Sequence, residues 1–458
     1  MTRSSKSAAD GLSSIQDLKH LIVSVLRLGK EAGADETEVH VDEVRSALTR
    51  FANNAIHQNV AECGVTISVR TVVDGRTARV ATNRTDEDSL RAAVASSLSL
   101  AHSQPKDPRL LPLPGKQRYK NVKRFLAATA KLSAADRARA VRKACDLAIK
   151  KGQVAAGIFS SGQTQTAIGN SRGLFAAYRQ TQAEFSITMQ ESGAASWAKA
   201  NTADVRGINS QALAERASRK AHLAVSPQEF TPGRYTVILE PAAVLDLVGF
   251  LFYDFAATAL EDKRSCLNER MGTQLFGKNI SITDDVYHPL QLGAPFDGEG
   301  MPRQKVSVVE NGVAKNLVFS RASAKRAKKL PTGHGFALPN EYGEAPMNLV
   351  FSGGDSSLEE MVASTNRGLL VTRLWYIREV DPYEKVLTGM TRDGLFLVEG
   401  GKVTRAVRNF RFNQSILEML RNVQQMTPAV RAAGEEAFEM VVPAMKISGF
   451  HFSEPTKF

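Results

Sequence analysis

The chain of 458 residues combines 43% hydrophobic residues with a formal net charge of +12 and a sequence pI of about 9.6. This length is enough for two or three domains, and no run approaches the ~20 consecutive apolar residues of a membrane-spanning helix. Three cysteines, Cys63, Cys145 and Cys266, are far apart and odd in number, which argues against a disulfide framework and a paired-cysteine metal site. The polar amino-terminal residues 1–14 contain no apolar signal sequence, so we expect a cytoplasmic protein.

The positive charge makes nucleic acid or an acidic partner a class to consider. Basic residues are dense in two clusters, at 116–124 and 321–329. Base-stacking aromatics are absent from the second cluster and limited to Tyr119 in the first. We therefore favour solvated faces, and keep as the alternative a functional basic patch formed by Lys325, Arg326, Lys328 and Lys329.

The first unit begins with apolar residues at helical spacing over 15–28. Alternation then predicts antiparallel strands at residues 38–44, 47–53 and 64–70. Asn53-Asn54 is typical of a hairpin turn, a second helix is predicted over 86–102, and four prolines in 104–115 predict a linker. We expect residues 1–115 to form an α+β repeat with its linker.

The second unit, residues 116–230, resembles the first in the order of its elements. Helices are predicted at 134–151 and 210–222, and strands at 155–166 and 174–190. Gly33 and Gly152 occupy corresponding places, as do Asn83 and Asn201. Similar spacing favours a duplication over two unrelated α+β units.

The third unit, residues 231–458, is β-rich and begins with a largely apolar run at 233–266. A strand at 235–239 leads through Pro241 into a helix predicted over 242–260 and buried on most sides. Further strands are predicted at 305–310, 313–319, 348–352, 368–376, 395–399 and 402–409, and helices at 356–364 and 414–423. The expected fold class is α+β: a duplicated helix–sheet–helix unit, then a large domain of curled antiparallel sheets around a buried helix.

Catalytic motifs are scarce. None of the eight histidines is followed by Glu and no two lie three to five residues apart, so a helical zinc motif cannot be built locally. The 169–173 stretch matches G-x-S-x-G, but strands are predicted on both sides of it and a plain turn is favoured. Cys266 lies between two arginines, yet a buried structural thiol is the favoured interpretation.

The Thr332-Gly333-His334 loop follows the second basic cluster. Glycine permits a close approach of another backbone, so these three residues are our candidates for a substrate cleft that binds a peptide carboxylate or backbone. A simple turn after Pro331 is the equal alternative.

Collinear motifs over most of the chain resemble the TldD/PmbA family, and its PmbA (TldE) branch more than the zinc-bearing TldD branch. The residues that carry the resemblance are Asn53 to His57, Asn170 to Gly173, Pro295 to Gly300, Ser323 to Lys325, Thr332 to His334, Asn348 to Gly354, Leu358 to Met361, Gly368 to Val371, Val398 to Val403 and Pro443 to Ile447. Each motif alone is weak, and their common order is the specific signal.

The resemblance also implies where zinc would be bound. In the TldD branch the helix after the first strand carries His-Glu-x-x-x-His, and a Cys near the C-terminus is the third ligand. Aligned on that motif, Leu245 and Phe250 occupy the two His positions and Asp246 the Glu position, while 438–442 contains no Cys. Hydrocarbon side chains cannot ligate zinc, so we expect no catalytic residue, metal or cofactor in this chain.

The resemblance thus implies a non-catalytic subunit that pairs with a TldD-like, zinc-bearing chain to degrade unfolded or extended peptides. Two alternatives remain open: a homodimeric peptide-binding or scaffolding protein without protease activity, and a nucleic-acid binder that uses the basic patch. Neither membrane binding nor a reading motif for nucleic acid is predicted.

Overall fold

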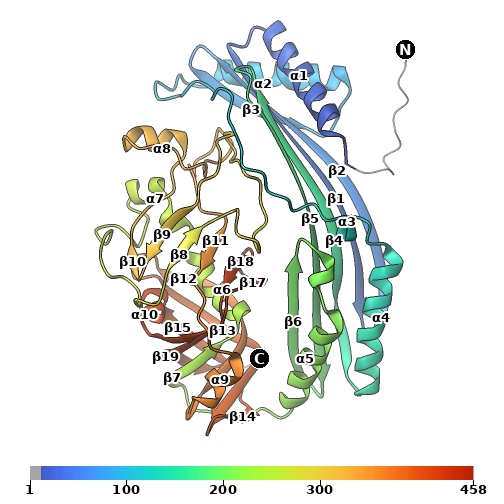
Figure 1. Ribbon diagram of the computed structural model, residues 1–458, viewed down its shortest axis with the longest axis vertical. Helices are drawn as coiled ribbons and strands as arrows, with labels where there is room; N and C mark the ends of the chain where they lie inside the picture. The colour runs from blue at the N-terminus through green and yellow to red at the C-terminus, as the bar shows by residue number, and fades with distance from the viewer. Residues whose placement is uncertain (1–11, 457–458) are drawn as a thin grey trace.

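The computed structural model describes residues 12–456 (Figure 1). Its amino-terminal half is built on one long six-stranded sheet. The strands lie in the order β3 (Arg76–Thr82), β2 (Ala55–Val73), β1 (Glu36–Ala52), β4 (Val154–Asn170), β5 (Phe175–Glu191) and β6 (Ala194–Thr202). All neighbouring strands in this sheet are antiparallel.

The two predicted α+β units meet within this sheet, because β1 pairs with β4 from Glu38↔Asn170 to Phe51↔Gly157. Each unit contributes a three-stranded meander. The turn between β1 and β2 is made by Asn53 and Asn54, both with positive φ, which is the backbone that a two-residue hairpin turn requires. The predicted boundary between domains 1–115 and 116–230 remains a prediction.

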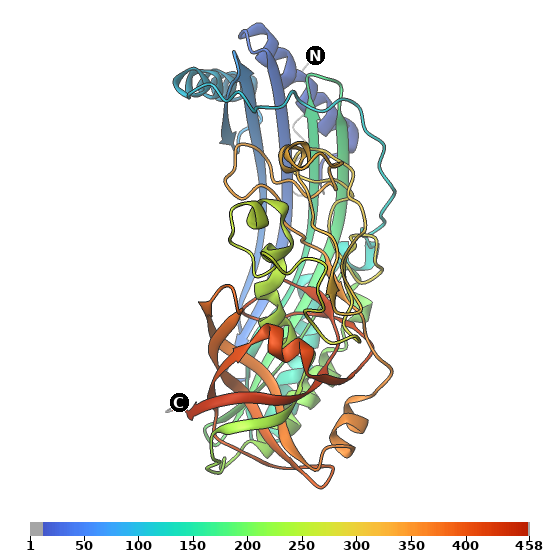
Figure 2. The ribbon, with the colours of Figure 1, turned by 90° about the vertical axis from the view of Figure 1, so that its left-hand side faces the viewer.

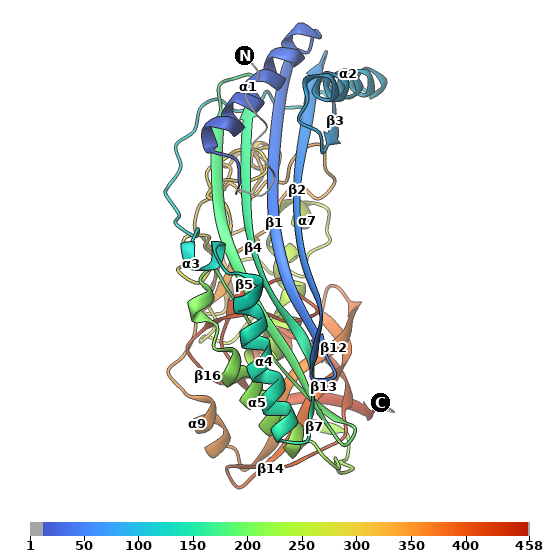
Figure 3. The ribbon, with the colours of Figure 1, turned by 90° about the vertical axis from the view of Figure 1, so that its right-hand side faces the viewer.

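Helices cover one face of the long sheet (Figure 3). They are α1 (Ile15–Glu31), α2 (Glu87–Ser103), the short α3 (Ala127–Ala130), α4 (Ala134–Lys150) and α5 (Ser210–Leu223), with a 3₁₀ turn η1 at Val205–Gly207. Ser14 and Ser133 begin α1 and α4 with capping boxes, which satisfy otherwise free N–H groups. The apolar stripe of α1 then packs on the sheet through residues such as Leu18 and Ile22.

The carboxy-terminal half lies against the other face of the long sheet (Figure 2). It contains two sheets. One has the order β10 (Val313–Ala314), β9 (Val306–Glu310), β8 (Ile282–Asp284), β11 (Leu349–Phe351), β18 (Met440–Val442) and β17 (Val430–Ala432). The other has the order β12 (Arg367–Asp381), β7 (Gly233–Leu239), β19 (Met445–Pro455), β15 (Phe410–Ser415), β13 (Val386–Glu399) and β14 (Lys402–Ala406), with β16 (Val423–Met426) paired to β19.

These sheets confirm the β-rich half that the sequence predicts, with one difference in pairing. Most pairs are antiparallel, but β7–β12 and β11–β18 are parallel. In both parallel pairs the two strands are far apart in the sequence, so no hairpin signal reveals them. Short helices complete this half: α8 (Arg321–Arg326), α9 (Leu358–Ala363) and α10 (Ile416–Arg421).

The buried helix predicted over 242–260 is three consecutive pieces. They are α6 (Pro241–Val248), the 3₁₀ segment η2 (Gly249–Phe255) and α7 (Ala257–Glu261). The long helix is interrupted because Ala256 has an extended backbone at the junction of η2 and α7. Since α6 contacts β12 of one sheet and β17 and β18 of the other, it lies between the two sheets.

Within residues 12–456 no helix is long and apolar enough to cross a membrane. The amino-terminal residues on which the cytoplasmic prediction rests lie almost entirely outside the described part of the chain. That localisation therefore stays a prediction.

Candidate functional site

The site begins with the three positions that the family resemblance singles out on α6 and η2. Leu245 and Asp246 are fully buried, and Phe250 is partly buried against the main core. Leu245 is itself part of that core. Two of the three side chains therefore pack as hydrocarbons, and neither offers a donor atom to a metal.

Asp246, the one polar residue of the three, is bound to backbone. Its Oδ1 accepts hydrogen bonds from the N–H groups of Glu435 at 3.4 Å and Glu436 at 3.3 Å. Its Oδ2 has no hydrogen-bond partner among the described residues. Burial raises the pKa of Asp246 to about 7, against the opposing effect of these N–H groups, of the backbone of Leu374 and of Arg373. The carboxyl thus anchors a neighbouring segment.

That neighbouring segment is 433–438, which runs over α6 and η2. A Cβ at Gly434 would lie 2.2 Å from Oδ1 of Asp246, and one at Gly249 would lie 2.4 Å from Cβ of Ala437. The rings of Phe252 and Phe438 meet edge to face with centroids 5.3 Å apart. The structure therefore places the 433–438 segment beside α6. The resemblance implies this neighbourhood, because in the TldD branch a Cys near the C-terminus completes the zinc site of this helix. The 433–438 segment contains no Cys.

A cleft of about 460 Å³ opens beside this contact. Aromatic and charged side chains line it together. The lining residues are Gly249, Phe250, Phe252, Tyr253, Asp254, Arg264, Glu379, Lys385, Glu435, Glu436, Ala437 and Phe438. Aromatic side chains beside groups that can form hydrogen bonds are typical of a binding site, although half of these lining residues are charged. Phe250 is the candidate position that reaches the cleft.

Lys385 forms ion pairs with two of the acidic residues that line this cleft. Its Nζ lies 2.6 Å from Oδ2 of Asp254 and 2.8 Å from Oε1 of Glu379. Burial opposes the charged form, yet the two carboxylates hold the pKa of Lys385 above its ordinary value. Cys266 donates its backbone N–H to Asp254, and burial raises the pKa of its thiol, so it is a structural cysteine and not a nucleophile.

The Thr332-Gly333-His334 loop lies in another part of the carboxy-terminal half. His334 is buried, with Nε2 2.8 Å from Oδ1 of Asp284 and Nδ1 2.9 Å from Oγ1 of Thr332. Both imidazole nitrogens are thus engaged within the protein. Gly333 is packed against the backbone of Pro302 and Arg303. A substrate cleft at this loop stays a prediction.

The basic patch on and after α8 is partly engaged in packing. Arg326 forms a two-pronged ion pair with Glu261, with nitrogen–oxygen distances of 2.7 to 2.9 Å. Lys329 lies 5.9 Å above the ring of Phe319, whereas Lys325 and Lys328 are exposed. No aromatic residue stands between Lys325 and Lys328 in the sequence. The patch therefore lacks the stacking groups of a nucleic-acid surface.

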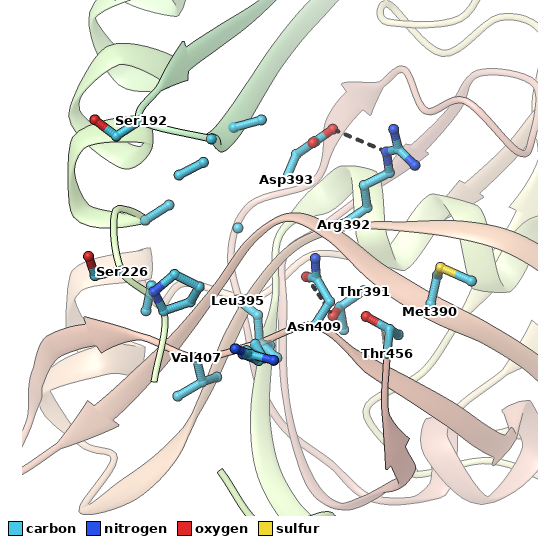
Figure 4. A pocket seen from close by; sticks show the side chains of 18 residues that line it. Ser192, Ser226, Met390, Thr391, Arg392, Asp393, Leu395, Val407, Asn409 and Thr456 are labelled. Carbon is cyan, nitrogen blue, oxygen red and sulfur yellow. Dashed lines mark hydrogen bonds and ion pairs between the residues drawn. The ribbon is translucent and has the colours of Figure 1, made fainter. Parts of the chain in front are cut away.

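A second cavity, of about 680 Å³, lies where the β5–β6 turn meets β13 and the connection from β14 to β15 (Figure 4). Asp393 there is paired with Arg373, whose Nε is 2.7 Å away, and with Arg392 at 3.9 Å. Thr391 donates a hydrogen bond to Asn409 at 3.0 Å. Its charged and polar groups thus bind one another, which suits a seam between the two halves more than a reaction site.

Residues 12–456 contain no group of three His, Cys, Asp or Glu side chains placed to hold a metal ion. At the position where the resemblance would place zinc, two of the three side chains are hydrocarbons and the third accepts backbone hydrogen bonds. The residues present there do not fit a zinc ion.

Comparison with known families matches nearly all of the chain. Residues 38–101 match domain 1 of the PmbA/TldA metallopeptidases, 123–225 the central domain and 232–454 the C-terminal domain. The chain belongs to the PmbA/TldD family. The expected family resemblance is thereby confirmed.

Curated relatives and solved structures agree. The metalloprotease PmbA homolog of Haemophilus influenzae is 23% identical over 95% of this chain and 96% of its own length. An uncharacterized protein of Methanocaldococcus jannaschii is 33% identical over 36% of this chain, a match that spans only 39% of that relative. The crystal structure of TldE from Thermococcus kodakarensis superimposes with a TM-score of 0.86 at 20% identity, covering 94% of this chain and 100% of that one.

Sequence reasoning found the three positions on α6 and η2 but missed the cleft beside them. Glu379 and Lys385 reach it from β12 and from the β12–β13 turn. No local motif surrounds them, so nothing in the sequence marks them as neighbours of Phe250. The aromatic run at 250–255 was the one available signal.

Proposed function

We propose that this chain is the metal-free subunit of a two-component TldD/TldE-type metallopeptidase, and that a TldD-like partner supplies the zinc. In this proposal the pair degrades or processes unfolded peptides. The observation that carries it is the replacement of the zinc motif by Leu245, Asp246 and Phe250, in a chain that is otherwise a member of the metallopeptidase family.

The packing around Asp246 supports a structural and not a catalytic role for this helix. A general base must reach water and substrate, but Asp246 is fully buried and its Oδ1 faces the backbone of the 433–438 segment. In this proposal α6 holds the two carboxy-terminal sheets together while peptide bonds are cleaved in the other subunit.

The cleft beside η2 supports a role in holding peptide. Its aromatic wall, Phe250, Phe252 and Phe438, suits apolar side chains of an unfolded chain. Its carboxylates, among them Glu379 and Glu436, suit peptide N–H groups or basic side chains. Such a surface binds many sequences with little selectivity, as processing of unfolded peptides requires.

The decisive experiment combines a metal analysis with reconstitution. The purified chain is expected to contain far less than stoichiometric zinc after dialysis and to leave a disordered peptide intact. Addition of a family member with an intact His-Glu-x-x-x-His helix should give cleavage that EDTA abolishes, at a rate above that of the partner alone. Stoichiometric zinc in this chain, or EDTA-sensitive cleavage by it alone, would refute the proposal.

A matched pair of variants tests the cleft in the same assay. Phe250→Glu places a charge on the aromatic wall and should weaken peptide binding by about tenfold, because it removes apolar contact area. Phe230→Leu, in another part of the core, serves as the control and should leave peptide affinity unchanged. Equal peptide affinity in wild type and Phe250→Glu would show that the cleft does not bind peptide.

A further inference from the structure

The connection between α2 and α3, residues 104–126, crosses the upper end of the long sheet and then follows one side of the molecule down to α3 (Figure 2). We call this connection the strap. It contains the first basic cluster of the sequence, at 116–124, and no acidic residue follows position 107 within it. Neither the family resemblance nor the cleft beside η2 accounts for this charge.

Side chains on the inner side of the strap fix it to the carboxy-terminal half. The hydroxyl of Tyr119 donates a hydrogen bond to the carbonyl of Gly300 at 2.8 Å, and its ring meets Phe296 edge to face with centroids 5.5 Å apart. Arg124 donates from Nε to the carbonyl of Gln291 at 2.8 Å. The strap is thus a fixed scaffold for the residues on its outer side.

The outer side of the strap carries a row of cations. Lys116, Arg118, Lys120 and Lys123 are exposed, and none of the four forms an ion pair with another described residue. Exposed and partly buried residues alternate from 116 to 120, as in an extended chain. Alternate residues of an extended chain are about 6.6 Å apart. The row therefore matches the side-chain spacing of a second extended polypeptide.

A cavity of about 1050 Å³ opens at the Lys116 end of this row. Gly173 lines the cavity, and a Cβ at Gly173 would lie 3.4 Å from Cε of Lys116. The row of cations thus begins at the rim of the cavity. The apolar wall comes from α1, β2 and the strap, and consists of Val23, Leu26, Val72, Leu110, Leu111 and Pro112.

The acidic residues of the cavity are engaged by neighbouring groups. Glu36 forms an ion pair with Arg172. Asp35 accepts a hydrogen bond from the backbone N–H of Asp74 at 2.7 Å, and Asp107 accepts one from a backbone N–H at 2.8 Å. The cavity therefore offers an apolar wall whose carboxylates are already bound, next to cations that are not.

We propose that the cavity and the outer side of the strap bind an extended acidic segment of another polypeptide. Apolar side chains of that segment occupy the cavity, and its carboxylates follow the four cations of the strap. Charge complementarity selects the acidic residues, and the apolar wall provides an anchor beside them. The inference does not rest on the proposed peptidase role, because none of these residues lines the cleft beside η2.

Nucleic acid fits this surface less well than an acidic polypeptide does. The strap has two aromatic residues, Tyr119 and Phe125. Tyr119 is bound on the inner side, and the guanidinium of Arg179 covers the ring of Phe125 at 4.5 Å. Neither ring is free to stack on a base. The apolar wall of the cavity suits aliphatic side chains of a protein.

Fluorescence anisotropy of a labelled disordered peptide tests the row of cations. The acidic probe has two leucines followed by glutamates that alternate with serines, and the neutral probe has glutamine for each glutamate. The wild-type chain should bind the acidic probe at least about tenfold more tightly, and added salt should reduce this preference. Arg118→Glu with Lys120→Glu should abolish it. Arg142→Glu with Lys143→Glu, at exposed positions of α4, changes the net charge equally and should keep it.

A charge exchange provides a gain of binding. A probe with lysine for each glutamate should bind the Arg118→Glu/Lys120→Glu variant more tightly than it binds wild type, because the interacting charges are reversed on both sides. Phe250→Glu, which changes the cleft beside η2, should leave the binding of the acidic probe unchanged.

The cavity is tested through its apolar wall. Val23 is 54% exposed on α1, so Val23→Gln removes apolar contact without opening the core. It should weaken the acidic probe about fivefold, but should not affect an acidic probe whose leucines are replaced by serines. Ile149→Gln, at a residue that is 61% exposed on α4, is the control and should not change either affinity.

Four results would overturn the proposal. They are equal affinity of wild type for the acidic and neutral probes, an unchanged preference in Arg118→Glu/Lys120→Glu with a wild-type thermal unfolding curve, equal affinity for probes with and without leucines, and loss of binding in Phe250→Glu. A single-stranded oligonucleotide that binds more tightly than the acidic probe, and loses affinity in Arg118→Glu/Lys120→Glu, would assign the strap to nucleic acid instead. None of these measurements involves zinc or peptide cleavage, so the proposed function is tested separately.

Discussion

Asp246 occupies a position where a related enzyme would carry an acid for chemistry, and here the acid serves packing. One oxygen binds the backbone of the 433–438 segment and the other lacks a hydrogen-bond partner among the described residues. A buried carboxyl of this kind is more stable neutral than ionised. Its ionisation state therefore affects how firmly the segment is held on α6.

The pKa of Asp246 leads to a prediction for stability against pH. The native pKa is about 7 and the unfolded value is close to 3.9, so the native state binds the extra proton between these values. The free energy of unfolding therefore falls by up to roughly 4 kcal/mol as the pH rises from about 4 to 7. Asp246→Asn, which keeps an acceptor oxygen, should lack this loss.

Urea unfolding of wild type and Asp246→Asn at pH 4.5, 5.5, 6.5 and 7.5 provides the measurement. The difference in unfolding free energy should shift in favour of the variant with increasing pH and level off above about pH 7. Using the difference removes the effects of other carboxyls such as Glu38, whose pKa is lowered to about 2, and Glu299, whose pKa is raised to about 7. Parallel pH profiles would contradict the assignment.

At the scale of elements, the sequence predicts those whose signals are local. The Asn53-Asn54 hairpin and the capped helices α1 and α4 follow from short-range rules and are present as expected. β3 and β6 were not predicted, because RTARVAT and AASWAKANT alternate weakly. Their strand conformation is imposed by pairing with the longer strands beside them.

The break after α6 shows the same limit. An apolar run at 242–260 predicts one helix, but the chain must place Gly249 against Ala437 and bring Asp254 to Lys385. Both partners lie more than 100 residues away in the sequence. Contacts of this kind, which also form the cleft, depend on tertiary packing and leave no periodic signal.

The contact of the 433–438 segment with α6 can be tested with one methyl group. Gly434→Ala would place a Cβ 2.2 Å from Oδ1 of Asp246, and relief of such an overlap typically costs about 1–3 kcal/mol. Gly115→Ala, with nothing within 4 Å of its Cβ, should change stability little. Chemical unfolding midpoints compare the two variants, and an equally small effect at both sites would disprove the close contact.

For the whole molecule, the important feature is the seam between the long sheet and the carboxy-terminal half (Figure 1). Arg431 of β17 donates from Nε to Asn201 of β6 at 3.0 Å and lies 3.6 Å from Glu439. Lys199 donates to the carbonyl of Gly434 at 3.1 Å. The segment that rests on α6 is thus also bound to the long sheet.

Removal of the Arg431 guanidinium should loosen this seam. Arg431→Met keeps the apolar stem but removes the guanidinium that binds the side-chain oxygen of Asn201 and the carboxylate of Glu439, so we expect a loss of roughly 2–4 kcal/mol in unfolding free energy. We also expect faster proteolysis between the two halves. Arg109→Met, at an exposed and distant arginine, is the control and should stay within about 0.5 kcal/mol of wild type. Equal stability and protease resistance would mean that the seam does not depend on Arg431.

The central pairing of β1 with β4 has a consequence for the order of synthesis. β1 ends at residue 52, and its second neighbour is not complete until residue 170. At about 5–20 residues per second, the ribosome needs roughly 5 to 20 s to make the missing strand. During that time the nascent β1–β2 hairpin presents two open edges instead of one. The nascent chain therefore needs a chaperone most before β4, β5 and β6 have been synthesised.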